Sequence, residues 1–163
     1  MLITLSKLIA SFFGSGYLPR MPGTWGTIGA LLCSFFFQNL SPFVLFLITI
    51  STTFVGLFVS EISLKAQNYN DMDPSWIVID EVAGYFWAIS LISLVRPLDC
   101  MQLILAFVFF RIFDIMKPWP ISWVDRSMAA SSKTAALGII LDDVIAGILA
   151  AAFTLFACRI IVS

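Results

Sequence analysis

The sequence predicts an all-α, polytopic membrane protein: a bundle of about five transmembrane helices preceded by a short N-terminal helix that is interfacial or re-entrant. Three observations support this fold class. Hydrophobic residues make up 60% of the 163 residues, well above the roughly 45–50% that is usual in soluble domains. Charged residues make up only 12%, and the mean hydropathy is +1.00. Apolar runs near the roughly 20 residues that a bilayer crossing needs recur along the chain.

The elements follow one another in a simple order. The first thirteen residues, MLITLSKLIASFF, are too short to span a bilayer and lack the small-residue cleavage site of a signal peptide, so we expect an interfacial or re-entrant helix. Turn residues such as NLSP and RPLD separate the later runs. No internal repeat is visible, and we expect residues 1–163 to form a single membrane-embedded domain. The crossings are expected at about 24–40, 42–64, 76–95, 98–116 and 138–161.

The distribution of basic residues predicts the orientation. The segment 119–135 mixes Trp123 with charges and is expected to lie along the membrane interface, where tryptophan is enriched. With five crossings, Arg96 and Arg159 are the only basic residues on one side of the membrane. The other side is therefore predicted to be cytoplasmic, by the positive-inside bias. It carries Lys7, Arg20, Lys65, Arg111, Lys117, Arg126 and Lys133.

Composition also excludes several classes of function. The net charge is −1 and there is no basic stripe, so we expect no nucleic-acid partner. Histidine is absent, which excludes self-contained histidine-based hydrolase, protease and zinc sites. Cys33, Cys100 and Cys158 stand alone in apolar surroundings and are expected to be neither metal ligands nor disulfide partners. No feature indicates an oligomeric state.

Three clusters of charged residues lie just inside the ends of apolar helices, and alternating topology brings them to one depth on the cytoplasmic side. An ionised side chain costs about 2.5–3.5 kcal/mol at the centre of a membrane helix and less near the interface. The carboxylates therefore need neutralising partners. The clusters are Asp80 with Glu81; Arg111, Asp114 and Lys117; and Asp142 with Asp143.

Simpler explanations exist for each cluster. The two acidic pairs lie in the first turns of their helices, where the helix dipole favours a negative charge by about 0.3–1 kcal/mol. Asp114 instead lies near a helix C-terminus, where the dipole opposes it, so it requires a cation. Arg111 at i−3 and Lys117 at i+3 lie on the same face and can supply one, which is equally consistent with a salt-bridged helix end.

Together the clusters indicate phosphoryl chemistry. Carboxylate ligands without histidine or cysteine select a hard cation such as Mg²⁺, which is commonly held by one or two carboxylates and a substrate phosphate. Arg111 and Lys117 would then contact an anionic substrate.

The glycine-rich stretch GSGYLPRMPGTWGT, residues 14–27, runs directly into a helix, so its amides and the positive helix end can cradle a phosphate. It is no Walker motif, and a tightly packed re-entrant turn is the alternative. The DMDPS segment at 71–75 resembles an aspartyl-nucleophile motif only superficially, because it follows a polar loop rather than a buried strand.

Four stretches in this order, GSGYLPRMPGTWGT, IDEVAG, FRIFDIMKPWPISWVDR and LDDVIAG, resemble the phosphatidylglycerophosphatase A family. Members of that family remove the terminal phosphate of phosphatidylglycerophosphate. The resemblance covers most of the chain; the crossing around 42–64 carries no motif, and the one departure is a short N-terminus. It implies a Mg²⁺-dependent lipid phosphatase with a phospholipid substrate, acting from the cytoplasmic leaflet of the bacterial inner membrane.

Roles are assigned to residues on this basis, as a hypothesis. The nucleophile is expected to be a metal-bound water, with an aspartyl-phosphate on Asp114 as the alternative. The catalytic residues are Asp114, Arg111, Lys117 and Glu81; the metal ligands are Asp80, Glu81, Asp114, Asp142 and Asp143; and the substrate-binding residues are Arg20, Gly23, Thr24, Gly26, Thr27 and Arg126.

Two other classes of function are compatible with parts of the sequence. A small divalent-cation transporter would place its carboxylates at the bilayer midplane and show inverted repeats, whereas here they lie near helix ends and no repeat occurs. A non-catalytic membrane subunit, whose charges only specify helix pairing, would tolerate an exchange of Arg111 and Asp114.

Overall fold

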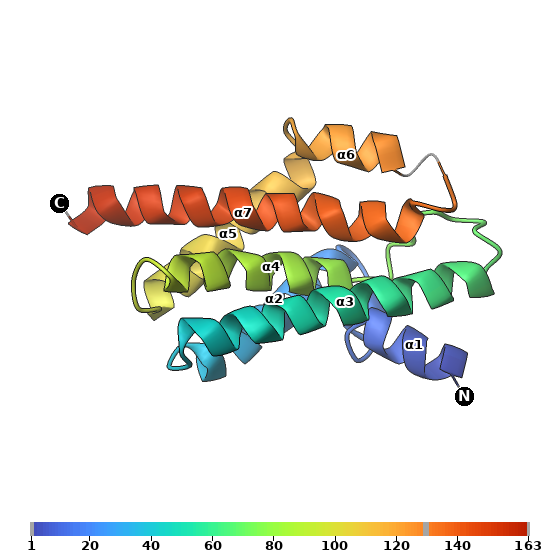
Figure 1. The fold of residues 1–163 in the computed structure, drawn as a ribbon, viewed down its shortest axis with the longest axis horizontal. Helices are drawn as coiled ribbons and strands as arrows, with labels where there is room; N and C mark the ends of the chain where they lie inside the picture. Colours follow the sequence, from blue (N-terminus) through green and yellow to red (C-terminus); the bar gives the residue numbers. More distant parts are fainter. Residues whose placement is uncertain (1, 129–130, 163) are drawn as a thin grey trace.

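In a computed structural model the chain is all-helical, as predicted (Figure 1). The structure describes residues 2–128 and 131–162, and these contain no β-strand. The elements are α1 (Leu2–Ala10), the 3₁₀ helix η1 (Ser15–Tyr17), α2 (Pro22–Phe37), α3 (Pro42–Ala66), α4 (Ile79–Ser93), α5 (Cys100–Met116), α6 (Ile121–Met128) and α7 (Ala135–Val162).

Local sequence signals explain where several helices begin. Pro22 and Pro42 each lie in the first turn of a helix, where the missing N–H costs nothing. The Ser41 side chain accepts a hydrogen bond from the Val44 amide at the start of α3. Asp99 and Gln102 form a reciprocal capping box at the start of α5.

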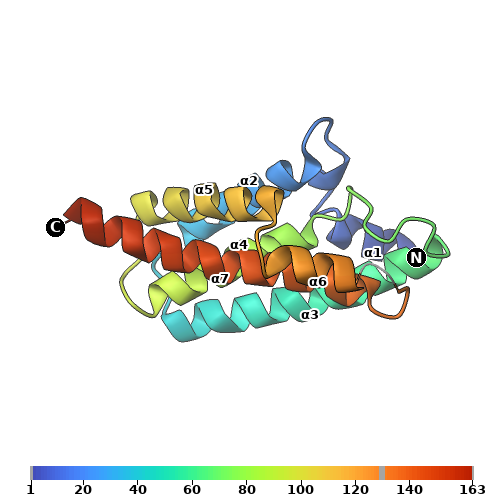
Figure 2. The ribbon, with the colours of Figure 1, turned by 90° about the horizontal axis from the view of Figure 1, so that it is seen from above.

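Helix α4 forms the centre of the bundle. It packs against α2, α3, α5 and α7, and eleven of its fifteen residues are buried. Helix α7 runs along most of the elongated molecule beside it, as both ribbon views show (Figures 1 and 2). The contact between α4 and α7 is therefore the main axis of the fold.

Two glycines allow α4 and α7 to approach closely. A Cβ at Gly147 would overlap the carbonyl oxygen of Gly84, and one at Gly84 would lie 2.6 Å from the carbonyl oxygen of Asp143. Small residues at such a crossing let two backbones come into contact, which is typical of helices packed in membranes.

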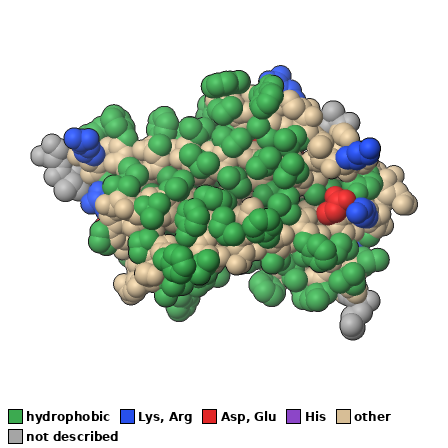
Figure 3. Space-filling model, in the orientation of Figure 1, with side chains coloured by type: hydrophobic (Ala, Val, Ile, Leu, Met, Phe, Trp, Pro, Cys, Tyr) green, Lys and Arg blue, Asp and Glu red, His purple; other side chains and the backbone are tan. Residues whose placement is uncertain are grey.

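The surface is consistent with a membrane protein. On the face shown in Figure 3 hydrophobic side chains cover the middle of the molecule, and charged side chains gather towards its two ends. Two helices are long and apolar enough to span a bilayer: α3, and α7 over residues 135–160. Helices α2, α4 and α5 have 16, 15 and 17 residues, roughly 23–26 Å at 1.5 Å per residue. Five crossings therefore stay a prediction.

The segment predicted to lie along the interface contains the short helix α6, which packs against α7. Trp119 and Trp123 there are exposed, at 80% and 61%. Residues 129–130 of this segment lie outside the described residues. Helix α1, predicted to be interfacial or re-entrant, packs against α3.

Candidate active site

A cavity of about 430 Å³ opens at one end of the bundle, where α2, α4 and α7 begin and α5 ends. Its chemistry is dominated by charge, because six acidic and two basic side chains line it. The basic pair is Arg111 and Lys117, and the acidic residues are Asp73, Asp80, Glu81, Asp114, Asp142 and Asp143.

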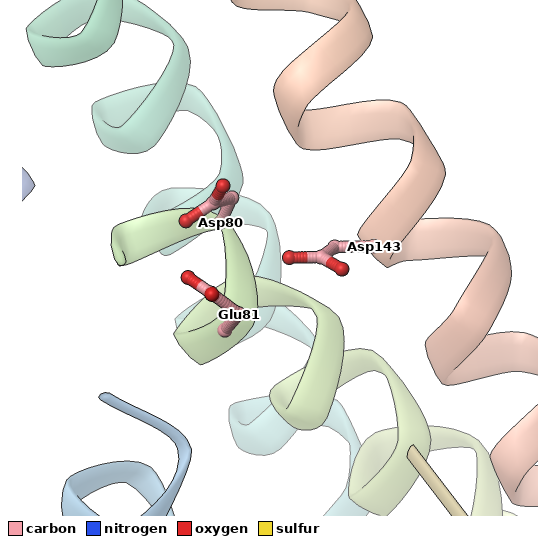
Figure 4. Close-up of side chains that lie close together, drawn as sticks. All are labelled: Asp80, Glu81 and Asp143. Atoms are coloured by element: carbon pink, nitrogen blue, oxygen red, sulfur yellow. The ribbon is translucent and has the colours of Figure 1, made fainter. Parts of the chain in front are cut away.

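Three of the carboxylates form a compact group. Asp80, Glu81 and Asp143 each offer an oxygen, and these oxygens lie within 4.8 Å of one another. Figure 4 shows the three side chains converging on the space between α4 and α7. Asp80 and Asp143 are 7% and 3% exposed. Asp80 Oδ1 and Glu81 Oε2 are buried and have no hydrogen-bond partner among the described residues.

Helix packing explains why this acidic trio forms. Gly84 follows Asp80 by four residues, and Gly147 follows Asp143 by four, so each carboxylate lies one turn from the close α4–α7 contact on its own helix face. Gly23 at the start of α2 brings a third backbone to the site, because a Cβ there would overlap Glu81 Oε1.

Arg111 connects α5 to both neighbouring helices. Its Nη1 lies 2.5 Å from Asp114 Oδ2 one turn along α5, and 4.0 Å from Glu81 Oε1 on α4. The same nitrogen donates to Thr27 Oγ1 on α2 at 3.4 Å. Its Nε is buried without a hydrogen-bond partner among the described residues.

Lys117 ends α5 in the left-handed conformation, with φ 41°. Its Nζ donates to Asp142 Oδ2 on α7 at 2.7 Å and to Asp125 Oδ1 on α6 at 2.9 Å. Burial acts to lower the pKa of Lys117, but the two paired carboxylates outweigh it, and the pKa lies above the ordinary value for lysine. The ammonium group is therefore charged at any working pH.

The structure brings most of the sequence-predicted residues together. The cavity is lined by Gly23 and all seven charged residues of the three clusters. Thr27 does not line it but accepts a hydrogen bond from Arg111. One pairing differs from expectation: Arg111 alone pairs with Asp114, whereas Lys117 pairs with Asp142 and Asp125. The left-handed turn at Lys117 takes its side chain off the helical face that the i+3 spacing implied.

Of the six predicted substrate-binding residues, only Gly23 lines this cavity, and the other five do not. Arg126 is exposed and its Nε donates to the Ser122 carbonyl oxygen at 2.9 Å. Gly26 packs against Val78, where a Cβ would lie 2.8 Å from Val78 Cβ. Arg20 and Thr24 line a separate, neighbouring groove.

Sequence reasoning missed Asp73, Ser75 and Asp125. Asp73 and Ser75 line the cavity from the loop before α4, and Asp125 pairs with Lys117. The DMDPS segment does not fit a nucleophile motif, yet its position just ahead of an acidic helix start is a usable signal for Asp73 and Ser75. The DR pair in the block after KPWP was the corresponding signal for Asp125.

The acidic trio fits a hard divalent cation. Arg111 neutralises Asp114 and lies near Glu81, and Lys117 neutralises Asp142, whereas Asp80 and Asp143 have no ion-pair partner among the described residues. Buried carboxylates without a countercharge are costly. An all-oxygen donor set with unpaired, buried oxygen atoms is the kind of site that Mg²⁺ prefers.

The fold and the site thus define an apolar helical-bundle protein with an acidic cavity that also contains two basic side chains, Arg111 and Lys117. The chain belongs to the phosphatidylglycerophosphatase A family, whose model matches residues 8–158.

Comparison with individual proteins agrees with this assignment. The chain is 34% identical to phosphatidylglycerophosphatase A of Escherichia coli over 91% of its length and 81% of the relative's. It is 32% identical to phosphatidylglycerophosphatase A of Haemophilus influenzae, over 88% and 82% of the two chains. A Bacteroides thetaiotaomicron protein, provisionally named a phosphatidylinositol-3-phosphatase, is 32% identical over 88% and 87%. No solved structure matches the chain.

Proposed function

We propose that this chain hydrolyses the terminal phosphate of phosphatidylglycerophosphate, giving phosphatidylglycerol and inorganic phosphate. The observation that carries the proposal is the family match over residues 8–158. The names of the two phosphatidylglycerophosphatase relatives support the substrate. The meeting of the acidic trio with Arg111 and Lys117 in one cavity supports the reaction class.

The proposed cofactor is Mg²⁺, held by Asp80, Glu81 and Asp143. When bound there, the ion would neutralise charge on the phosphate and lower the pKa of a coordinated water. Asp114 and Asp142 were expected to be ligands as well. Because each is paired with a cation, we instead assign them to orienting Arg111 and Lys117.

The chain's own residues supply the rest of the mechanism. Arg111 offers its guanidinium group and Lys117 its ammonium group to the oxygens of the terminal phosphate, which balances the charge that spreads over them in the transition state. The bond that breaks joins phosphorus to the glycerol oxygen, and that oxygen leaves with a proton. A solvent oxygen joins the phosphorus, Asp114 is the proposed acceptor of its proton through the carboxylate oxygen that Arg111 does not hold, and Asp114 then passes that proton to the leaving glycerol oxygen.

We also propose that the chain crosses the bacterial inner membrane five times, with the cavity facing the cytoplasm. The two candidate spans and the hydrophobic middle of the molecule support membrane association. The cavity opens at the end where seven of the nine basic residues are expected by the positive-inside bias. A cysteine introduced at Ser75, at the cavity mouth, should be labelled by a membrane-impermeant thiol reagent only from the cytoplasmic side, in a variant lacking the three native cysteines.

The activity is tested by phosphate release from phosphatidylglycerophosphate in mixed micelles. The purified parent and Asp114→Asn are each assayed with EDTA and with added Mg²⁺. We expect the parent to be active only with the metal, and the folded variant to be reduced by roughly 10²–10⁴-fold, the usual contribution of a general base. A folded parent that releases no phosphate under any metal condition would show that the assigned reaction is wrong.

A further inference from the structure

A second groove lies directly beside the active-site cavity. It has a volume of about 670 Å³ and is lined by Pro19, Arg20, Met21, Thr24, Trp25 and Ile28. Met21 lines both spaces, and Gly23 of the cavity precedes Thr24 of the groove in α2. The groove is formed where the chain before α2, which projects from the bundle in Figure 2, turns into that helix.

The groove differs chemically from the cavity. Apolar side chains supply most of its lining, and Trp25 and Met21 are 42% and 60% exposed. Its single charge is Arg20, which is exposed and forms no ion pair within the described residues. The Thr24 hydroxyl is buried and also lacks a hydrogen-bond partner among them. The groove thus combines an apolar wall with one free cation.

The proposed substrate needs such a space. Phosphatidylglycerophosphate carries two phosphates, a terminal monoester and an inner diester, separated by one glycerol and followed by the diacylglycerol. With the monoester beside Arg111 and Lys117, the diester lies one glycerol away and the acyl chains must leave towards the bilayer. The cavity itself is a poor place for a second anion, because its six acidic side chains outnumber its two basic ones.

We propose that this groove binds the lipid end of the substrate, an inference that rests on the proposed function. Arg20 pairs with the inner phosphodiester. The wall formed by Met21, Trp25 and Ile28 holds the start of an acyl chain. Three observations carry the assignment: the groove adjoins the cavity at Met21, which lines both, its charge complements the diester, and its wall is apolar. The bilayer is then the side from which the lipid reaches the cavity.

Kinetics of the full chain in mixed micelles test the assignment. Arg20→Gln should raise KM for phosphatidylglycerophosphate by about tenfold and leave kcat within about twofold, because the diester does not change during the reaction and its binding is uniform. Arg20→Lys should recover most of the loss. Lys133→Gln, which removes an exposed positive charge outside both spaces, serves as the matched control and should behave like the parent.

Two fragments of the substrate separate the groove from the cavity. Phosphatidylglycerol has the diester but no monoester, and inorganic phosphate resembles only the monoester. Arg20→Gln should raise the inhibition constant of phosphatidylglycerol by about tenfold and leave that of inorganic phosphate unchanged. Equal KM and equal phosphatidylglycerol inhibition in Arg20→Gln and the parent would overturn the assignment.

A binding measurement distinguishes failure of the groove from failure of the proposed activity. Phosphatidylglycerol with a photoreactive acyl chain should label residues 19–28 of the parent more strongly than the matching diacylglycerol probe, which lacks the diester, and Arg20→Gln should remove the difference. A parent that labels in this way but releases no phosphate would overturn only the proposed reaction. Equal labelling by both lipids would overturn the groove whether or not the chain is active.

Discussion

At the scale of single residues, each cation of the cavity is shared between carboxylates from different helices. Arg111 contacts Asp114 on its own helix and lies near Glu81 on α4, and Lys117 contacts Asp125 on α6 and Asp142 on α7. Such pairs are weak evidence for stability, since desolvation offsets much of their attraction. Their value here is geometric, because they fix two positive charges beside the acidic trio.

The position of Lys117 depends on Asp125, which sequence reasoning did not select. Asp125→Asn removes one of the two charges that hold the ammonium group, and we expect kcat/KM for phosphatidylglycerophosphate to fall roughly tenfold, about 1.4 kcal/mol of transition-state stabilisation. Steady-state phosphate release in mixed micelles provides the measurement. Glu61→Gln breaks a comparable ion pair with Lys65 outside the cavity and should leave kcat/KM unchanged. Parent-like kinetics in Asp125→Asn would remove Asp125 from the mechanism.

An exchange of Arg111 and Asp114 distinguishes an enzyme from a non-catalytic subunit. Arg111→Asp combined with Asp114→Arg keeps an i,i+3 ion pair on α5, so we expect the bundle to fold. Phosphate release should nevertheless fall by at least about 10²-fold, because the guanidinium leaves its place beside Glu81 and Thr27. Size-exclusion elution and thermal unfolding in detergent check the fold. A folded, fully active exchange variant would support a role limited to helix pairing.

At the scale of elements, the α4–α7 contact positions the acidic trio. The motifs IDEVAG and LDDVIAG each place a glycine three to five residues after their acidic residues, and the two glycines meet at the crossing. The backbone contact and the carboxylate cluster are therefore one feature of the sequence. Moving either helix outward would separate Asp143 from Asp80 and Glu81.

Gly147→Ala tests this dependence. The added Cβ would overlap the Gly84 carbonyl oxygen, so the helices must move apart. We expect a loss of about 1–3 kcal/mol in the free energy of unfolding, as for other overpacked contacts, together with a higher Mg²⁺ concentration for half-maximal activity. Thermal unfolding in detergent and a Mg²⁺ titration measure the two effects. Ile148→Ala, at the neighbouring exposed position, should leave the Mg²⁺ requirement unchanged. An unchanged requirement in Gly147→Ala would mean that the close crossing does not position the trio.

At the scale of the whole molecule, helical identity and most helix ends follow from local signals. The run predicted at 42–64 became α3 at 42–66, because Ser41 and Pro42 define its start. Helices α2, α4 and α5 have 16, 15 and 17 residues, fewer than the roughly 20 of a full crossing, because polar and turn segments such as NLSP and RPLD interrupt the apolar runs. Composition counts hydrophobic residues but does not measure this interruption, which is why it could not fix the number of crossings.

The site residues near helix ends could be predicted from the sequence, because the end of a membrane helix determines how deep its residues lie in the bilayer. Asp80, Asp114 and Asp143 could be brought together from topology alone, because alternating crossings place the starts of α4 and α7 and the end of α5 on the same side of the membrane. The places of Asp73, Arg20 and Arg126 depend on the paths of loops and of a short helix, for which one sequence contains no periodic signal. Loops and the short helix α6 thus account for the missed residues and for two of the misplaced ones, Arg20 and Arg126.

We propose that the acidic trio of Asp80, Glu81 and Asp143 holds a divalent cation that the lipid phosphatase requires. The most direct measurement counts Mn²⁺ bound to the purified chain by electron paramagnetic resonance, alongside phosphate release, in the parent, in Asp143→Asn and in the control Glu61→Gln. We expect bound Mn²⁺ and metal-dependent phosphate release in the parent and control, and loss of both in folded Asp143→Asn. Phosphate release that survives complete chelation in the parent, or Mn²⁺ binding unchanged by Asp143→Asn, would contradict the account.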